Sequence, residues 1–98
     1  MRKKATADSL KNFDALEYPV KFSIKIIMIS DPGNSKNIED LNLILNKYSI
    51  KLDKPWTFTE SSKGNYTSYT GSLIVDTKSQ MYALYGELGK HPNIRYAI

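Results

Sequence analysis

The sequence predicts an α+β fold, a ferredoxin-like split β-α-β-β-α-β sandwich with a four-stranded antiparallel sheet and two helices on one face. Segments in which apolar and polar residues alternate, as in strands, surround two segments with helical spacing. The two middle strands are joined by a short turn that contains glycine. The length of 98 residues and the apolar content of 41% suit one domain with a real core.

The first strand and the first helix are predicted from a change in the spacing of apolar residues along the chain. Residues 20–28 alternate, which predicts a strand with one buried face. A turn at residues 31–34 ends this strand. Residues 37–48 carry apolar side chains three and four positions apart, which predicts a helix with Ser35 or Asn37 as its N-cap.

The second half of the chain predicts a hairpin, a helix and a last strand. Residues 56–59 and 66–76 alternate on either side of a glycine and asparagine turn. Thr77 and Gln80 have the spacing of a capping box at the start of a helix, and Gly89 marks its end. Residues 94–98 alternate again, which completes the sheet.

This arrangement assigns residues to the two faces of the sheet. The helix-covered face should hold Phe22, Ile24, Ile26, Met28, Trp56, Phe58, Tyr69, Leu73, Val75, Ile94, Tyr96 and Ile98. The open face should hold Lys21, Ser23, Lys25, Ile27, Ile29, Thr57, Thr59, Ser68, Thr70, Ser72, Ile74, Arg95 and Ala97. Residues 1–17 are polar and predict a flexible tail, so the domain is expected over residues 18–98.

The composition limits the cell compartments in which the protein is expected and the classes of partner that it could bind. The chain has no cysteine, which excludes disulfides and thiolate metal sites and favours the cytoplasm. No apolar run is long enough for a membrane span, and no apolar segment follows the basic start as a secretion signal requires. The formal charge of +4 is spread thinly over the chain, unlike the dense basic patch of a nucleic-acid-binding protein.

Catalytic and metal sites find little support. The single histidine, His91, lies in a loop, where packing or capping of a helix end is the favoured role. Acidic residues do not form a metal-ligand pattern, since adjacent Glu39 and Asp40 point in different directions on a helix. We therefore predict no catalytic residues, no metal and no cofactor.

Two candidate binding sites remain. The first is the strand-to-helix turn Asp31-Pro32-Gly33-Asn34, at a helix N-terminus where an anion could bind, although nearby acids oppose one. The second is the open sheet face, which combines polar residues with a few isoleucines; it is either solvated or a seam for a second copy or a partner. Its candidate residues are Lys25, Ile27, Ile29, Thr70, Ser72, Ile74 and Arg95.

RNA binding can be tested against the same face. RNA-recognition modules with this order of elements stack bases on aromatic side chains of the open face. The central strands are expected to present Ser23, Lys25, Ile27 and Ser68 there, with no aromatic residue among them. RNA binding is therefore disfavoured and rests mainly on Lys21, Lys25 and Arg95.

Four segments in order resemble the YbeD-like family of small uncharacterised bacterial proteins. They are Tyr18-Pro19 with the strand after it, residues 64–68, residues 83–88 and His91-Pro92-Asn93-Ile94. The resemblance covers residues 18–98 and implies a ferredoxin-like fold similar to the ACT domains, which bind amino acids and regulate enzymes, with no established activity. Gly71 and Gly86 depart from the pattern of that family.

The sequence thus favours a non-enzymatic, cytoplasmic regulatory or protein-interaction module. It would act through the open face or the turn at residues 31–34, with a homodimer or another protein as partner. A small-molecule sensor of the ACT type is the first alternative, and a weak RNA-binding domain is the second.

Overall fold

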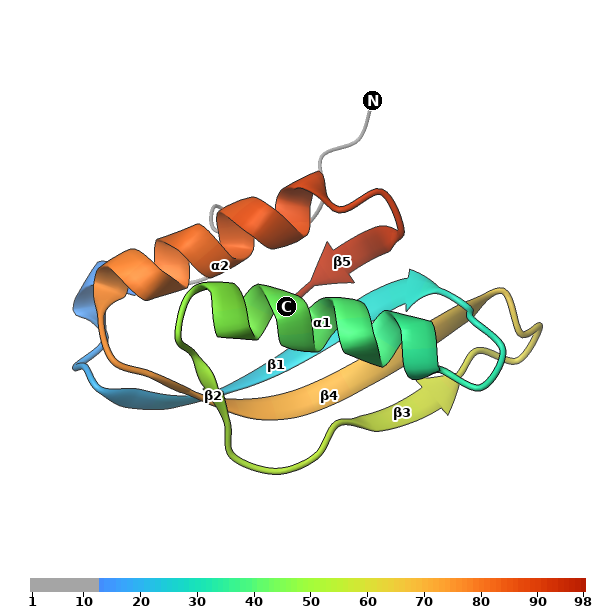
Figure 1. Ribbon diagram of the computed structural model, residues 1–98, viewed down its shortest axis with the longest axis horizontal. Coiled ribbons are helices and arrows are strands. Elements are labelled where there is room, and N and C mark those ends of the chain that lie inside the picture. Colours follow the sequence, from blue (N-terminus) through green and yellow to red (C-terminus); the bar gives the residue numbers. More distant parts are fainter. Residues whose placement is uncertain (1–12) are drawn as a thin grey trace.

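The computed structural model describes residues 13–98, which form a five-stranded sheet and two long helices (Figure 1). In chain order the elements are η2 (Phe13–Ala15), β1 (Val20–Ile29), α1 (Ser35–Lys47), β2 (Lys51–Leu52), β3 (Thr57–Glu60), β4 (Tyr66–Val75), α2 (Lys78–Lys90) and β5 (Ile94–Ala97). The predicted order of elements and the α+β class are confirmed.

The sheet is antiparallel, and both helices lie on the same side of it (Figure 1). Its order is β2-β4-β1-β5, and β3 also pairs with β4. The two long strands, β1 and β4, occupy the centre and pair along their whole length, from Val20 opposite Val75 to Ile29 opposite Tyr66. The other face of the sheet carries no helix, as the sequence predicts.

The edge next to β4 is interrupted where the sequence predicts a single strand. Leu52 of β2 lies opposite Leu73, and Thr57 of β3 lies opposite Thr70. The amide of Asp53 still donates to the carbonyl of Ser72, so the chain bulges away from β4 at residues 54–55 before the ring of Trp56 packs over Gly71. A Cβ atom at Gly71 would lie 2.6 Å from Cζ3 of Trp56, so this position has no room for a side chain.

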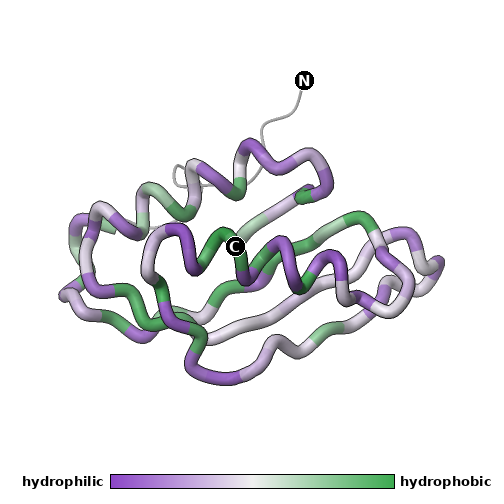
Figure 2. The backbone as a smooth tube through the Cα atoms, viewed as in Figure 1, coloured by the Kyte–Doolittle hydropathy of each residue, from purple (hydrophilic) through white to green (hydrophobic). Residues whose placement is uncertain are grey.

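The core lies between the sheet and the helices; in Figure 2 the hydrophobic colour is strong along β1 and at the end of β4 that leads to α2, whereas the rest of β4 is pale. Its fully buried members include Ile24, Ile26, Met28, Tyr69, Leu73, Val75, Met81, Leu84, Leu88 and Ile94. α2 contributes most of the helical part, and its start is fixed by the capping box. The Thr77 hydroxyl accepts from the amide of Gln80, whose side chain accepts from the amide of Thr77.

The assignment of faces in the last strand is wrong beyond Ile94. Ile27 lies opposite Tyr96 and Met28 opposite Ile94, so Arg95 is an extra residue in a β-bulge. The bulge reverses the alternation after it. Tyr96 and Ile98, expected in the core, are 44% and 51% exposed, whereas Ala97 is buried.

Phe58 also differs from its predicted environment. It lies opposite Tyr69, on the helix side of the sheet as expected, but it is 50% exposed. β3 is the edge strand, and α1 lies above the neighbouring strands, so no helix covers this ring (Figure 1).

The ordered domain begins before residue 18. Phe13 is buried against Phe22, Tyr82 and Tyr85, and its carbonyl accepts a hydrogen bond from the Tyr18 hydroxyl. The predicted tail is therefore wrong from Phe13 onward, because aromatic packing fixes this segment. Its remainder, residues 1–12, lies outside the described residues.

Candidate functional site

The open face of the sheet gathers the candidate residues that the sequence predicts. Paired residues of antiparallel strands point to the same face. Lys25 lies opposite Thr70 and Ser23 opposite Ser72, and Ile74 lies opposite Lys21 on the same face. Ile27 and Ile29 follow Lys25 along β1, each two residues further on. Arg95 is exposed at the bulge.

One end of this face is apolar and aromatic. Tyr66 lies opposite Ile29, and Tyr96 lies opposite Ile27. Ile98 exchanges two main-chain hydrogen bonds with Lys25, at 2.8 and 2.9 Å, so its side chain joins the same face. These residues form what we call the open-face patch: Ile27, Ile29, Tyr66, Tyr96 and Ile98. Tyr66 is 41% exposed, close to the value for Tyr96.

The charges on this face are mostly positive. Lys21, Lys25 and Lys51 project from its strands, and Arg95 lies at its rim. Asp53 lies beside Lys21, with 3.4 Å between its carboxylate oxygen and Nζ. The cations therefore outnumber the acids around the open-face patch.

A shallow hollow of about 240 Å³ lies next to the patch. Lys25, Ile27, Tyr66 and Ser68 line it, together with residues 59–61. It is smaller than the cavities of about 300–1,000 Å³ that usually hold metabolites and cofactors.

The second candidate site, the turn Asp31-Pro32-Gly33-Asn34, has its helix donors occupied. Asn34 is the N-cap of α1, in a left-handed conformation with φ of 65°, in place of the predicted Ser35 or Asn37. The Asp31 carboxylate accepts from the amides of Lys36 and Asn37, at 2.9 and 3.1 Å. An anion at this N-terminus would therefore have to displace a carboxylate of the chain itself.

The polar side chains behind this turn bond to one another. Asn37 is buried, and its side-chain amide donates to the main-chain carbonyl of Ile29 and to the hydroxyl of Tyr69. The Tyr69 hydroxyl donates in turn to the side-chain oxygen of Asn34. Burial raises the pKa of Tyr69, so the ring stays neutral. This network joins β1, α1 and β4, which is a structural use of the polar residues.

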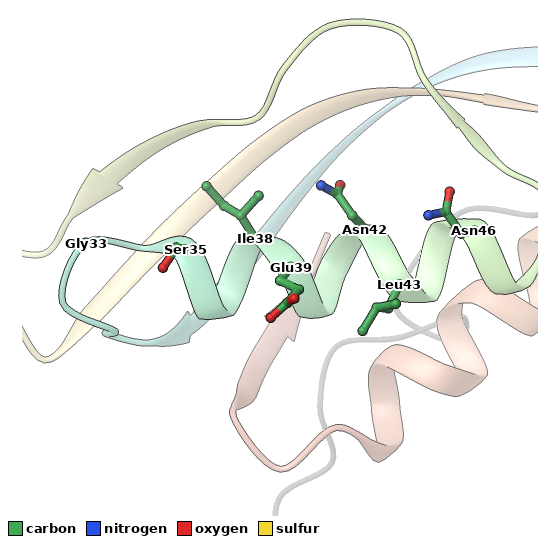
Figure 3. Close-up of a pocket in the computed structure, with 7 residues that line it drawn as sticks. All are labelled: Gly33, Ser35, Ile38, Glu39, Asn42, Leu43 and Asn46. Carbon is green, nitrogen blue, oxygen red and sulfur yellow. The ribbon is translucent and has the colours of Figure 1, made fainter.

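The surface of α1 carries a broader depression of about 580 Å³ (Figure 3). All its lining residues come from α1 and the turn before it. Ile38, Asn42 and Asn46 point to one side of the helix, whereas Leu43 points to another (Figure 3). Because no second element of the described chain contributes to its lining, this depression lacks the opposing wall of a ligand site.

His91 ties the end of α2 to α1. Its Nε2 lies 3.2 Å from a carboxylate oxygen of Asp40, and its Nδ1 accepts from the amide of Asn93. Burial raises the pKa of Asp40, but hydrogen bonds from Lys36 and His91 outweigh it and hold the pKa below its usual value. Among residues 13–98, no three histidine, aspartate or glutamate side chains lie close enough together to hold a metal ion.

The region with this architecture matches a known family model from residue 14 to residue 98, described as a protein of unknown function, DUF493. The chain belongs to the DUF493 family. Neither helix of the described DUF493 domain has the length and hydrophobicity needed to cross a membrane.

Curated relatives agree with this assignment. The chain is 32% identical over 91 residues to a UPF0250 protein of Haemophilus influenzae strain PittEE, covering 93% of this chain and 95% of the relative. It is 31% identical over 85 residues to a UPF0250 protein of Pasteurella multocida, covering 87% and 92%. No solved structure matches the chain significantly.

Sequence reasoning missed the aromatic part of the site in this DUF493 protein. Tyr96 was expected in the core, and the bulge at Arg95 moves it out. Tyr66 is in phase with Ser68 along β4, so simple alternation could have placed it on the open face. The expectation that the central strands present no aromatic residue is therefore wrong for β4.

Proposed function

We propose that this chain is a non-enzymatic, cytoplasmic interaction module whose open sheet face binds a partner protein with acidic groups around an apolar centre. The observation that carries the proposal is the open-face patch, an aromatic and aliphatic surface that no element among residues 13–98 covers. A sheet face that is only solvated would carry polar residues there.

The composition of the patch is that of an interface centre. Tyrosine is enriched among residues that dominate binding energy, because it adds a large rigid surface and a hydroxyl at low entropic cost. Tyr66 and Tyr96 flank the partly buried Ile27 and Ile29. A partner that covers them would desolvate two rings and several aliphatic side chains together.

The charges define which partner fits. Lys25 and Arg95 lie beside the patch, and Lys21 and Lys51 lie further along the same face. Such a rim speeds encounter with an acidic surface and disfavours a basic one. His91 has a structural use, because its ring nitrogens link the end of α2 to Asp40 and to the amide of Asn93.

The test compares Ile27→Glu with Ser79→Glu, a change of the same charge at an exposed position of α2. Tagged wild-type and variant chains would be used to capture proteins from a cytoplasmic extract of the source bacterium. Any protein that Ile27→Glu loses and Ser79→Glu keeps would then be purified for calorimetric titration. We expect an acidic protein that binds wild type directly; identical capture by both variants contradicts the proposal.

A second candidate function, binding of single-stranded RNA, is favoured by one observation. The two exposed tyrosines lie on the same face as Lys25 and Arg95, and stacking on aromatic rings beside cations is how RNA bases are held. Fluorescence anisotropy with a labelled mixed-sequence RNA should then give affinity that falls steeply with salt and is lost in Tyr96→Ala. Absence of binding at low salt ends this candidate.

A further inference from the structure

We propose that two copies of this chain pair through the outer edges of their β3 strands, antiparallel and centred on Thr57, to form one continuous sheet. The paired surface is the sheet edge, so the proposal does not depend on the function of the open face. The two-fold axis would be perpendicular to the sheet, with all four long helices on one side.

The first support is an unpaired row of main-chain groups. Among the described residues, β3 pairs only with β4. The amide of Ser61 donates to the carbonyl of Tyr66 at 2.8 Å, which fixes the alternation of the ladder. Residues 57 and 59 therefore bond toward β4, and the N–H and C=O groups of Phe58 and Glu60 face outward. An outward row of this kind is a template for another strand.

The second support is the aromatic side chain at this edge. Phe58 is 50% exposed on the helix side, and its ring centroid lies 6.2 Å from that of Tyr69. Nothing lies beyond β3 on that side of the described chain (Figure 1). The ring is therefore placed to be buried by whatever pairs with β3.

The third support is a cleft that fits this ring. A cleft of about 430 Å³ lies between α1 and the bulged connection before β3, lined by Ile38, Asn42, Leu52, Asp53, Lys54, Pro55 and Trp56. Pairing centred on Thr57 places Phe58 of the second copy directly opposite Trp56. Each copy would thus bury its exposed phenylalanine at the cleft of the other, with the two aromatic rings in contact.

Charge complementarity selects the second copy and the register. Lys54 and Glu60 flank the aromatic pair, both are exposed, and neither forms an ion pair within residues 13–98. In the register centred on Thr57, Lys54 of each copy faces Glu60 of the other. Other antiparallel registers lose both contacts. The segment is thus complementary to its own reversed sequence.

The experiment measures the mass of the full chain by sedimentation equilibrium over a range of concentrations. We expect a reversible dimer. Lys54→Glu and Glu60→Lys each place like charges opposite each other twice, and each should raise the dissociation constant at least about tenfold. The combined variant with both changes restores opposite charges and should restore the dimer. If the two single variants are monomeric and the combined variant is monomeric as well, the register centred on Thr57 is overturned.

Two further variants separate the edge from the open face. Phe58→Pro removes an outward N–H and the ring, but an edge position tolerates proline, so circular dichroism should stay native while the mass becomes that of a monomer. Ile27→Glu should leave the dimer unchanged. A wild-type chain that is monomeric at every concentration overturns the proposal. So does a dimer that Ile27→Glu dissociates and Phe58→Pro does not.

Discussion

The turn before α1 and the open face of the sheet both present polar residues, but the fold uses them differently. At the turn, the Asp31 carboxylate fills the helix N-terminus, and Asn34, Asn37 and Tyr69 bond to one another. On the open face, Tyr66 and Tyr96 remain exposed beside lysines. The comparison teaches that a polar cluster indicates a site only where its hydrogen-bonding groups are not already used by the chain.

The largest expected effect is loss of the buried network behind the turn. Asn37→Ala removes the donor to the Ile29 carbonyl and to the Tyr69 hydroxyl, and leaving buried polar groups unpaired costs about 1–3 kcal/mol. Urea unfolding should show this loss. Asn46→Ala on the exposed side of α1 is the control, with a change within about 0.5 kcal/mol. Equal effects would contradict the structural role of the network.

Asp31→Ala should have the next largest effect. It removes the acceptor for two amides of α1, and the free energy of unfolding should fall by about 1 kcal/mol, as is typical for loss of a helix cap. Asp31→Asn keeps an oxygen and should lose less.

Because Asp31 occupies these amides, we expect amino acids to leave the melting temperature of the wild type unchanged. A rise in wild type that is absent in Asp31→Ala would instead support the sensor alternative.

A smaller effect is expected for the contacts that Lys36 and His91 make with the Asp40 carboxylate. Lys36 and His91 lower its pKa in the folded chain, despite burial. Its contribution to stability is therefore present above the unfolded pKa of about 3.9 and is lost as the pH falls toward the lower native pKa. Asp40→Asn should be less stable than wild type at neutral pH, by less than about 1 kcal/mol, because the site is partly solvated. The difference in the free energy of unfolding between Asp40→Asn and wild type should disappear in acid. A difference that does not change with pH contradicts the stabilising role of the Asp40 carboxylate.

The smallest effect on stability is expected on the open face. Ile27→Glu changes a residue that lies outside the core, so the free energy of unfolding should change by no more than about 0.5 kcal/mol. Thermal and urea unfolding together would measure it. A loss as large as that of Asn37→Ala would mean that the open face stabilises the fold and would remove the contrast between the two regions.

Local signals in the sequence predicted the parts of the fold that local interactions determine. The capping box of Thr77 and Gln80 and the alternation of β1 are complete within one turn or one strand. The bulge at Arg95 depends on pairing with β1, far away in the chain, so alternation alone misplaced Tyr96. The burial of Phe13 likewise depends on aromatic partners in β1 and α2.

The candidate site was predictable to a similar degree. Period two placed Lys25 and Ile27 on the open face, because the register of β1 is strongly determined by its core residues. The bonds of Asn37 to Tyr69 could not be predicted, because these residues are distant in sequence and only the fold brings them together. Gly71 had no local explanation until Trp56 was found above it.

The contact between Trp56 and Gly71 also gives this chain a built-in optical reporter. Trp56 is the only tryptophan of the sequence, is 7% exposed, and donates to the side chain of Asn42 at 2.9 Å. All indole fluorescence therefore arises at the interrupted edge of the sheet. Its emission wavelength and quenching should follow events at β3, such as the approach of another strand, without any label and separately from ligands that occupy the opposite face.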